Sequence, residues 1–482
     1  MRTSSAEVLI ELDRTRPRGL RAQIEDELRE AIRSGRLAPG TPLPSTRALA
    51  ADLDVTRGVV VAAYDQLLAE GYLASRPGSG TVVNATGGVR PAARRPRRDD
   101  SPVIVDFTPG LPDLDLFPRA AWLRVSRAAL QSVPGPQLGY ADPRGLPQLR
   151  EAVADYLGRV RGVSTDADHV VICNGFGHGL SLVVRAFLDT GRDLVAVEDP
   201  GHDGPRTEIE WVGARYRGIE VDADGIVVDA LRRSPARAVL LTPAHQFPTG
   251  AVLSPARRPE LAAWAQDVDG YVVEDDYDAE YRYDRHPVGA LQGVAPDRVV
   301  YGGTLSKSLA PGLRLGWLVV PPALLDPIVT GRHLVDHATS SFTQAAAAEL
   351  LANGDLDRHL RRTRRIYRQR RDALVAALAR WFPGATPSGI AAGLQVLVTL
   401  PPELDEAGVA QRALAAGVRV HPLGRYRVNR RSDRPPALVL GYGQLTPEQI
   451  EHGIRLLAGA SSQATSPAMR LTPPATITTP NT

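Results

Sequence analysis

The chain has 482 residues, of which 43% are hydrophobic and 23% are charged, values typical of a soluble globular protein with roughly two to four domains. No apolar run reaches the roughly 18 residues that cross a bilayer, and the N-terminus lacks an apolar signal core, so we expect a cytoplasmic protein without a membrane partner. The net charge of +3 indicates no partner by itself. Cys173 is the only cysteine, which excludes an internal disulfide and a cysteine-based metal site.

Helical patterns fill the first part of the chain. Apolar residues at four-residue spacing predict a helix over residues 20–34 with one buried face. Ser45 is placed to cap a short helix over residues 46–53, and Thr56 to cap a longer helix that runs to about residue 70. Two helices joined by so short a turn outline a helix-turn-helix, whose second helix enters the major groove of DNA by its N-terminal end.

Two short strands, residues 72–75 and 81–83, follow around a glycine-rich tip. Together with the helices they resemble the winged-helix DNA-binding domain of the GntR family, which we assign to residues 1–83. A three-helix bundle used for protein contacts is the alternative. The matching segments are Leu43-Pro44-Ser45-Thr46-Arg47, Val55-Thr56-Arg57, Glu70-Gly71-Tyr72-Leu73 and Gly78-Ser79-Gly80-Thr81.

The resemblance implies that this domain binds double-stranded DNA at an operator. Side chains at the starts of the two helices would meet phosphates and base edges, and the wing would touch the minor groove or the backbone. Val61 is apolar where some relatives place another cation, so base readout is unassigned. The implied contact residues are Ser45, Arg47, Thr56, Arg57, Arg76, Gly78, Ser79 and Gly80.

Two segments have compositions that cannot build a core. Residues 84–102 combine glycines, prolines and five arginines, which predicts a flexible or extended linker. These arginines either lie near DNA phosphates or merely solvate a tether. Residues 461–482 are rich in Ser, Thr, Pro and Ala, which predicts a disordered tail.

Short apolar β-rich runs alternate with helical patterns over residues 103–460. Unbroken apolar strands flanked by helices predict a three-layer α/β domain with a mainly parallel sheet covered on both faces. In such sheets ligands bind at the carboxyl ends of the strands, so the polar residues after each run are the candidate site. The clearest strands are residues 170–172, 194–197, 238–241, 271–273 and 298–301.

Polar residues do stand directly after several of these runs. Residues 174–180 form a glycine-rich turn that opens a helix, where backbone amides can hold a phosphate. Residues 274–278 supply a carboxylate and a phenol, and residues 304–307 end on Lys307, the only lysine in the chain. Arginine can replace lysine as a surface cation, but not where a primary amine must condense with a carbonyl. Taken alone, Lys307 could be a chance survivor; with its neighbours, the set fits pyridoxal phosphate.

The region resembles the fold-type I aminotransferases over essentially its whole length. Residues 304–316 match that family's Ser-x-Ser-Lys…Arg-x-Gly pattern. The resemblance implies that Lys307 is the catalytic residue, which forms a Schiff base with pyridoxal 5'-phosphate. Asp275 would pair with the pyridine nitrogen and Tyr277 with the ring hydroxyl. The implied phosphate ligands are Thr304, Ser306 and Arg314.

Two positions near the cofactor depart from the family pattern. Phe247 replaces the usual asparagine, so a ring-hydroxyl contact would come from His245 or Gln246. A Phe-Gly pair that ends at Gly177 replaces a Ser-Gln pair. The backbone amides around Gly177, together with His178, are then left to bind the phosphate.

Three further positions bear on the cofactor and the substrate. His202 replaces the tyrosine that stacks on the cofactor ring, and an imidazole can still stack. Tyr140 resembles the tyrosine that reaches the phosphate of the neighbouring subunit, which implies a homodimer. Val439 occupies the position of the arginine that clamps the substrate carboxylate, and losing a bidentate partner costs binding and orientation. Nearby arginines that could compensate are Arg425, Arg427, Arg430, Arg431 and Arg434.

A GntR-like head followed by an aminotransferase-like body resembles the MocR-type regulators. The resemblance implies a transcriptional regulator that binds DNA and senses either pyridoxal phosphate or an amino compound. The alternative is an active aminotransferase whose head tethers it to DNA, although the missing clamp predicts weak transaminase activity at most. The eight arginines of residues 358–371 indicate a solvated face or a dimer contact, with nucleic acid as the alternative.

Overall fold

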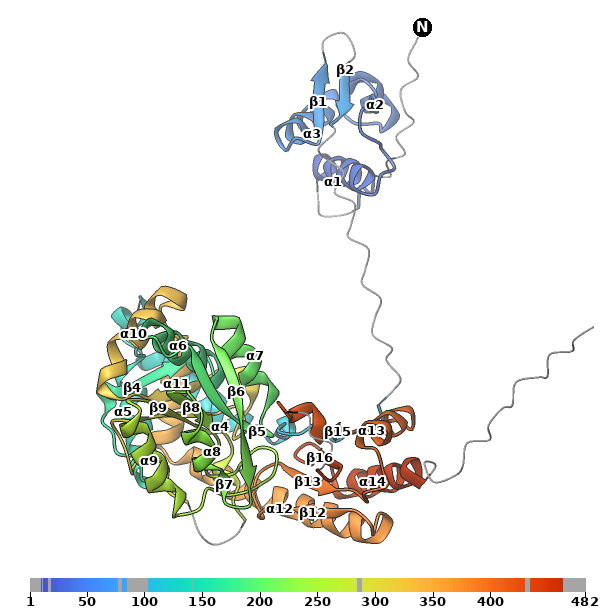
Figure 1. Ribbon diagram of the computed structural model, residues 1–482. Helices are drawn as coiled ribbons and strands as arrows, with labels where there is room; N and C mark the ends of the chain where they lie inside the picture. The colour runs from blue at the N-terminus through green and yellow to red at the C-terminus, as the bar shows by residue number, and fades with distance from the viewer. Residues whose placement is uncertain are drawn as a thin grey trace, which may run out of the picture. The chain divides into compact units, whose positions relative to one another are not determined.

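The computed structural model divides into two compact units, Met1–Asp100 and Ser101–Thr482 (Figure 1). The predicted linker beyond residue 84 and the predicted tail beyond residue 462 lie outside the described residues, and the predicted domain limits stay predictions. No helix in the described ranges is long and apolar enough to cross a membrane. The structure describes residues 10, 12–15, 19–76, 80–84, 103–140, 142–283, 288–429 and 434–462.

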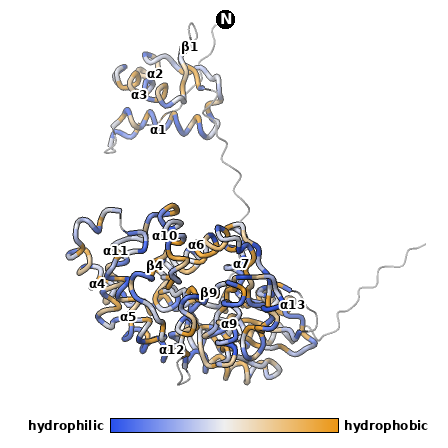
Figure 2. Tube along the Cα trace, turned by 60° about the vertical axis from the view of Figure 1, so that its left-hand side comes forward, coloured by the Kyte–Doolittle hydropathy of each residue, from blue (hydrophilic) through white to orange (hydrophobic). Residues whose placement is uncertain are grey.

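The N-terminal unit contains three helices and a two-stranded wing. The predicted buried face of the first helix is confirmed, because Ile24, Leu28 and Ile32 point into the core that the third helix also lines. Figure 2 shows the resulting alternation of hydrophobic and hydrophilic residues along α1. The strands pair antiparallel. The elements are α1 (Leu20–Arg33), α2 (Thr46–Asp52), α3 (Arg57–Ala69), β1 (Leu73–Arg76) and β2 (Gly80–Val83).

The two predicted helix caps differ in outcome. The Ser45 hydroxyl accepts a hydrogen bond from the amide of Ala48 at 3.2 Å, so it caps α2 as predicted. Thr56 has the extended backbone of an N-cap residue, but its side chain makes no capping bond. The amide of Val59 is bonded instead to the carbonyl of Thr56 at 3.0 Å. The main chain has therefore taken the donor that the Thr56 hydroxyl was expected to bind.

The C-terminal unit is organised around an eight-stranded sheet in the order β4-β11-β10-β9-β8-β5-β6-β7. The strands from β10 to β6 run parallel, whereas β11 is antiparallel to both β10 and β4, and β7 is antiparallel to β6. The predicted mainly parallel sheet is confirmed. Its strands are β4 (Val170–Cys173), β5 (Leu194–Asp199), β6 (Arg215–Asp222), β7 (Gly225–Ile226), β8 (Ala238–Leu241), β9 (Tyr271–Asp276), β10 (Val299–Thr304) and β11 (Gly316–Val319).

Helices cover both faces of this sheet. Val171, Val273 and Leu318 pack on one face with residues of α6, α7 and α10. Val239 and Val272 pack on the other face with α8 and α9, and further along that face lie α4, α5 and α11. Successive strand residues point to opposite faces, which explains the unbroken apolar runs. The helices are α4 (Arg119–Ser132), α5 (Pro147–Arg161), α6 (Phe176–Asp189), α7 (Asp203–Val212), α8 (Val228–Arg232), α9 (Arg257–Asp267), α10 (Pro322–Asp336) and α11 (Ser341–Ala352).

A smaller antiparallel sheet, in the order β12-β13-β16-β15, completes the unit. The long helix α12 leads into it and packs against α14, and a separate parallel pair joins β3 to β14. The elements are β3 (Val105–Asp106), α12 (Asp355–Trp381), β12 (Thr386–Ser388), β13 (Gln395–Thr399), α13 (Glu406–Ala415), β14 (Val418–Arg419), β15 (His421–Pro422), β16 (Ala437–Gly441) and α14 (Pro447–Ser462). Short 3-10 turns are η1 (Leu114–Leu116), η2 (Gly135–Leu138), η3 (Ala167–His169), η4 (Ala279–Tyr281), η5 (Pro311–Leu313) and η6 (Leu423–Tyr426).

Candidate cofactor site

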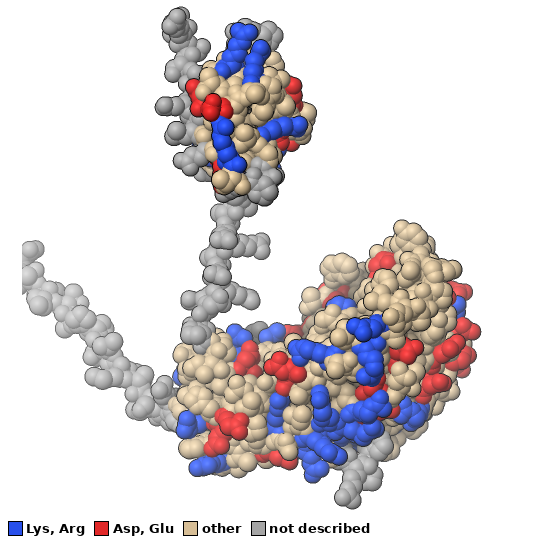
Figure 3. All heavy atoms as spheres, turned by 180° about the vertical axis from the view of Figure 1, so that it is seen from behind, with Lys and Arg blue, Asp and Glu red and all other residues tan. Residues whose placement is uncertain are grey.

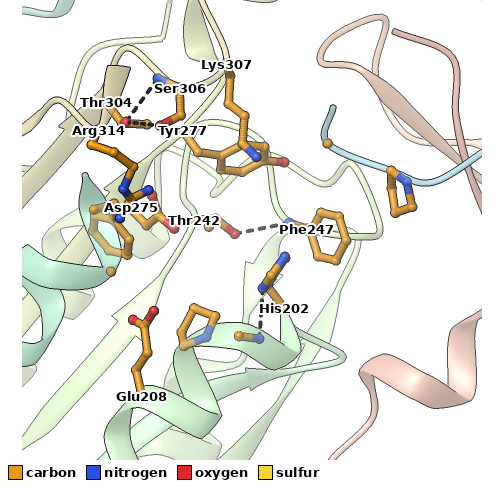
Figure 4. Close-up of a pocket in the computed structure, with 16 residues that line it drawn as sticks. His202, Glu208, Thr242, Phe247, Asp275, Tyr277, Thr304, Ser306, Lys307 and Arg314 are labelled. Atoms are coloured by element: carbon orange, nitrogen blue, oxygen red, sulfur yellow. Dashed lines mark hydrogen bonds between the residues drawn. The ribbon is translucent and has the colours of Figure 1, made fainter. Parts of the chain in front are cut away.

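A cavity of about 230 Å³ lies where the carboxyl ends of the central strands meet the start of α6 (Figure 4). Strand β10 leads into Thr304, Ser306 and Lys307, and strand β9 carries Asp275 and leads into Tyr277. All five side chains line the cavity. The structure thus brings together the amine, the carboxylate, the phenol and two hydroxyls that the sequence placed after separate strands.

The Lys307 amine faces the loop at Gly110. A Cβ built on Gly110 would lie 3.6 Å from Lys307 Nζ, and the φ of 74° at this position also favours glycine. Burial lowers the pKa of Lys307, while the carboxylates of Asp275 and Asp278 oppose that shift. A less basic amine is neutral more of the time, and the neutral form is the one that attacks a carbonyl.

Asp275 presents a carboxylate oxygen that lacks a partner. Its Oδ1 is buried and accepts no hydrogen bond from any described residue. Burial and the adjacent Asp276 raise the pKa of Asp275 well above its ordinary value, and Lys307 opposes the shift. An unsatisfied buried acceptor costs about 1–3 kcal/mol. A ring N–H that entered the cavity would satisfy it, and the protonated pyridine of pyridoxal phosphate carries such a donor.

The Tyr277 hydroxyl is fixed by its neighbours. It donates to the carbonyl of His245 at 3.2 Å and accepts from Nε2 of Gln395 at 2.9 Å. Gln395 belongs to β13 in the smaller sheet, and no local pattern in the sequence pointed to it. The phenol is therefore fixed at the cavity wall by a residue of the smaller sheet and by the loop that follows β8.

Arg314 lies against the glycine turn that opens α6. Its Nη2 donates to the carbonyl of Asn174 at 2.7 Å, and a Cβ on Gly175 would lie 3.2 Å from its Nη1. The Thr304 hydroxyl donates to Ser306 Oγ at 2.9 Å and accepts from the Ser306 amide at 3.1 Å. A guanidinium, two hydroxyls and the first amides of a 14-residue helix form a donor set suited to a phosphate.

Glu208 is a cavity residue that the sequence analysis missed. It projects from α7 toward Gly177, so close that a side chain at Gly177 would collide with its carboxylate. Its Oε2 is buried without a partner among the described residues, and burial raises the pKa of Glu208 while Arg314 opposes the shift. A carboxylate thus lies beside the phosphate cradle. Only the packing of α7 against the start of α6 brings it there.

Three predicted cofactor residues do not line the cavity. The Nδ1 of His178 accepts from the amide of Asn174 at 3.2 Å and lies 2.9 Å from Arg332 Nη1. His245 Nδ1 lies 2.9 Å from a carboxylate oxygen of Asp278. Both imidazoles are held outside the cavity by charged neighbours. These neighbours come from other parts of the chain, so sequence spacing does not predict the contacts. Tyr140 is 93% exposed, and its predicted contact with a neighbouring subunit stays a prediction.

His202 does line the cavity, as expected. Its Nδ1 accepts from the amide of Gly204 at 3.0 Å, which caps α7 and fixes the ring. Burial lowers the pKa of His202, and Lys307 and nearby arginines lower it further against Asp203. A neutral imidazole at this place offers a flat face to a ring in the cavity.

The predicted loss of the carboxylate clamp stays a prediction, and the structure shows only where Val439 lies. Val439 lies fully buried in β16, in an apolar cluster with Phe247 and Tyr426. Among the candidates to compensate, Arg425 is bonded to Asp203 at 2.8 Å and Arg434 lies 3.6 Å from Glu220. Neither these two nor Arg427 lines the cavity. Residues 430 and 431 lie outside the described ranges.

The predicted DNA-binding residues gather at the N-terminal ends of α2 and α3. Ser45, Arg47, Thr56 and Arg57 are all exposed there. The Nε of Arg57 lies 3.4 Å from the hydroxyl of Thr46, which links the two helix starts. In the wing Gly80 is exposed. Gly78, Ser79 and the side chain of Arg76 lie outside the described part.

Comparison with known proteins identifies both parts of the chain. Residues 107–457 match the family model for aminotransferase class I and II, and residues 20–83 match that for bacterial regulatory proteins of the gntR family. The chain is 34% identical over 478 residues to the probable rhizopine catabolism regulatory protein MocR of Rhizobium meliloti, covering 94% of this chain and 96% of that protein. It is 33% identical over 444 residues to the pyridoxine biosynthesis transcriptional regulator PdxR of Corynebacterium glutamicum, covering 91% and 95%.

Solved structures match the C-terminal unit. The multiple substrate aminotransferase of Thermococcus profundus superposes with a TM-score of 0.69 at 28% identity, over 76% of this chain and 93% of that one. The kynurenine aminotransferase of Pyrococcus horikoshii gives the same TM-score at 27% identity, over 76% and 93%. The fold and the cavity together imply pyridoxal 5'-phosphate as the cofactor.

Proposed function

Since the chain belongs to the MocR-type family of transcriptional regulators, in which a GntR-type winged helix precedes an aminotransferase-like domain, we propose that it regulates transcription in response to a ligand of the cofactor cavity. The N-terminal unit binds the operator through the exposed starts of α2 and α3 and the wing. The C-terminal unit binds pyridoxal phosphate and reports its state. A DNA-bound regulator works beside the nucleoid, so we assign it to the cytoplasm.

One observation carries the proposal. The cavity is lined by Lys307, Asp275 and Tyr277, the predicted cofactor residues, while Val439, predicted to stand at the position of the substrate clamp, is buried in an apolar cluster. Without a bidentate carboxylate partner an amino acid is poorly oriented for repeated turnover. The site is therefore better suited to occupancy than to a steady catalytic cycle.

The bound cofactor would supply an aldehyde that reacts with primary amines and a ring that withdraws electrons. Lys307 Nζ would hold the cofactor covalently, and Asp275 would keep the proton on the ring nitrogen. Arg314, the hydroxyl pair beside it and the amide of Gly177 would bind the phosphate. His202 would cover one face of the ring and exclude water from it.

The effector is either pyridoxal phosphate itself or an amino compound that competes with Lys307 for it. Either one regulates only if it binds two arrangements of the protein unequally. We further propose a homodimer, supported by exposed apolar side chains on elements that adjoin one another, since large exposed apolar patches mark interfaces. These side chains are Leu123 and Leu130 of α4, Leu138 of η2, Tyr140, Leu334 and Val335 of α10, and Phe342 of α11.

A working aminotransferase tethered to DNA is the second candidate. The lowered pKa of Lys307 and the cavity's intact cofactor set favour it. Incubation with amino donors and a keto acid separates the two. Turnover at ordinary enzyme rates that persists after removal of residues 1–83 would establish the enzyme and reject regulation as the sole role.

A gel-shift assay on DNA flanking the protein's own gene tests the proposed regulator. We expect a retarded band. The protein concentration that shifts half of the DNA, the midpoint, should change when pyridoxal phosphate is added. The Lys307→Ala variant should keep the cofactor-free midpoint and lose the response. Absence of a shift with and without cofactor would contradict the proposal.

A further inference from the structure

A second and larger cavity, of about 710 Å³, lies between the end of α5, the turn η4 and the first half of α12. None of its lining residues lines the cofactor cavity. Its volume falls within the range of small-molecule sites, roughly 300–1,000 Å³. Its basic residues are Arg159, Arg161, Arg282, Arg361, Arg364, Arg365 and Arg368, and we call this cavity the arginine cleft. Figure 3 shows a face of the C-terminal unit on which basic side chains gather in this way.

Three of these arginines have no partner among the residues that the structure describes. Arg361, Arg365 and Arg368 are exposed, and no described residue forms an ion pair or a hydrogen bond with any of them. They stand at spacings of four and three on α12, so they share one face of the helix. At 1.5 Å of rise per residue, their Cα atoms span about 10 Å along the helix axis.

The remaining bases of the arginine cleft are already engaged. Arg159 lies 3.1 Å from Asp357, and Arg364 donates to the carbonyl of Glu280 at 2.6 Å. Arg161 is buried and donates to Asp276 Oδ2 at 2.7 Å. These contacts fix the floor and the sides of the cleft. Among the described residues, only the guanidinium groups of Arg361, Arg365 and Arg368 are then left without a partner in the cleft.

The acidic residues of the cleft do not cancel this charge. Asp357 is bound by Arg159. The other lining acid is Glu280, whose carboxyl accepts from the Tyr156 hydroxyl at 3.3 Å, and burial raises its pKa to about 7. Like charges on one helix face repel one another, and an anion that binds them relieves this repulsion. The arrangement therefore suits a ligand with several negative charges.

We propose that the arginine cleft binds a small polyanion with consecutive phosphate groups, such as the chain of a polyphosphate or a nucleoside triphosphate. Guanidinium groups bind phosphate oxygens in pairs, and a row of three matches a row of phosphates better than a single carboxylate. The concave shape and the buried floor at Arg161 and Tyr156 favour a small molecule. A DNA duplex would reach only the rim.

Titration calorimetry with inorganic tripolyphosphate tests this site on the full-length, cofactor-loaded protein. We expect saturable binding at one site, weakened at least about tenfold in Arg361→Gln/Arg365→Gln/Arg368→Gln. The matched control is Arg185→Gln/Arg215→Gln/Arg232→Gln, which removes the same charge from exposed positions outside both cavities and should change the affinity by less than about twofold. Equal weakening in both triple variants, or no saturable binding, would overturn the proposal.

Two further measurements guard the result. The variant Arg361→Lys/Arg365→Lys/Arg368→Lys keeps the charge but loses the paired hydrogen bonds. We expect its affinity for tripolyphosphate to fall about threefold, to a value between those of the wild type and the glutamine variant. Cofactor absorbance of each variant reports whether it has folded.

DNA is the other polyanion that the arginines could meet. If the glutamine variant keeps its tripolyphosphate affinity but lowers the salt slope of binding to a duplex of unrelated sequence by about 3, the cleft binds the nucleic-acid backbone and the proposal is wrong.

Discussion

In the N-terminal unit, apart from the hydroxyl of Tyr64, Gln23 has the one polar side chain that is buried among residues 19–75 and 80–84. The C-terminal unit buries charged groups in and beside its large sheet, among them Glu198, Glu274 and Asp276 of its strands and Arg161 of α5. The first unit has its predicted DNA-binding residues on the surface, and its core is apolar. In the second unit the predicted cofactor residues and the buried charged groups belong to the same strands and helices that form the core. We therefore expect binding and stability to vary separately in the first unit and together in the second.

The largest effect is expected at the amine itself. Lys307→Ala should abolish covalent retention of pyridoxal phosphate, because no other described side chain of the cavity is a primary amine. The absorbance band near the visible edge should disappear, and borohydride reduction should no longer add the cofactor to the protein mass. Lys307→Arg is the matched control, since it keeps the cation without the nucleophile and should fail equally. A retained band in either variant would assign the covalent bond elsewhere.

Breaking the ion pair between Arg161 of α5 and Asp276 of β9 tests whether buried charged groups stabilise the fold. Arg161→Met leaves the Asp276 carboxylate without its 2.7 Å partner and should lower the free energy of unfolding by about 3–5 kcal/mol. All five tryptophans lie in the C-terminal unit, so tryptophan fluorescence in urea follows this unit alone. The double variant Arg161→Met/Asp276→Asn should recover part of the loss. A double variant no more stable than Arg161→Met would show that lost packing, and not an orphaned charge, is the cause.

Asp275→Asn should weaken the binding of pyridoxal phosphate by about 10–100-fold, since a hydrogen bond to a charged group is worth roughly 1.5–3 kcal/mol. A fluorescence titration measures the dissociation constant. Because the Asp275 carboxylate is unsatisfied in the cavity, the substitution should leave the stability of the cofactor-free protein unchanged or raise it. A destabilised cofactor-free variant would mean that this carboxylate also holds the fold.

The pH dependence of stability gives a smaller effect. Burial raises the pKa of Glu198 to about 7, above its unfolded value near 4.5, so the folded state binds the extra proton. This contribution is fully present below pH 4.5 and is lost as the pH rises through 7. Urea titrations of the C-terminal unit should show a falling stability over that window. Glu198→Gln should flatten the slope, and an unchanged slope would assign it to the other buried carboxyls.

The smallest effect belongs to the N-terminal unit. Ser45→Ala removes the cap of α2 and should cost about 1 kcal/mol of stability, measured by hydrogen exchange of the α2 amides. Thr56→Ala is the control, because the Thr56 side chain makes no capping bond, and it should cost less than about 0.5 kcal/mol. An equal loss in both variants would show that the hydroxyls act through something other than capping.

Short sequence patterns predicted the features that depend on residues close together in the chain. The strands, the helix-turn-helix and the residues at strand ends, such as Lys307 and Asp275, follow from short windows of sequence. Glu208 and Gln395 could not be found in this way, because each reaches its place from an element distant in the chain. His178 illustrates the converse, since Arg332 from α10 holds a side chain whose sequence position suggested the phosphate.

The antiparallel pair of β10 and β11 has a consequence for how the chain tolerates change. Thr304 pairs with Gly316, so the loop between them starts and ends at a fixed register. That one loop carries both Lys307 and Arg314, the predicted anchors for the two ends of the cofactor. The length of the loop therefore sets the distance between the two residues. Inserting a single residue between Lys307 and Arg314 would keep every side chain of the site but would move these two out of alignment. The length of this loop is therefore as much a part of the site as the amine.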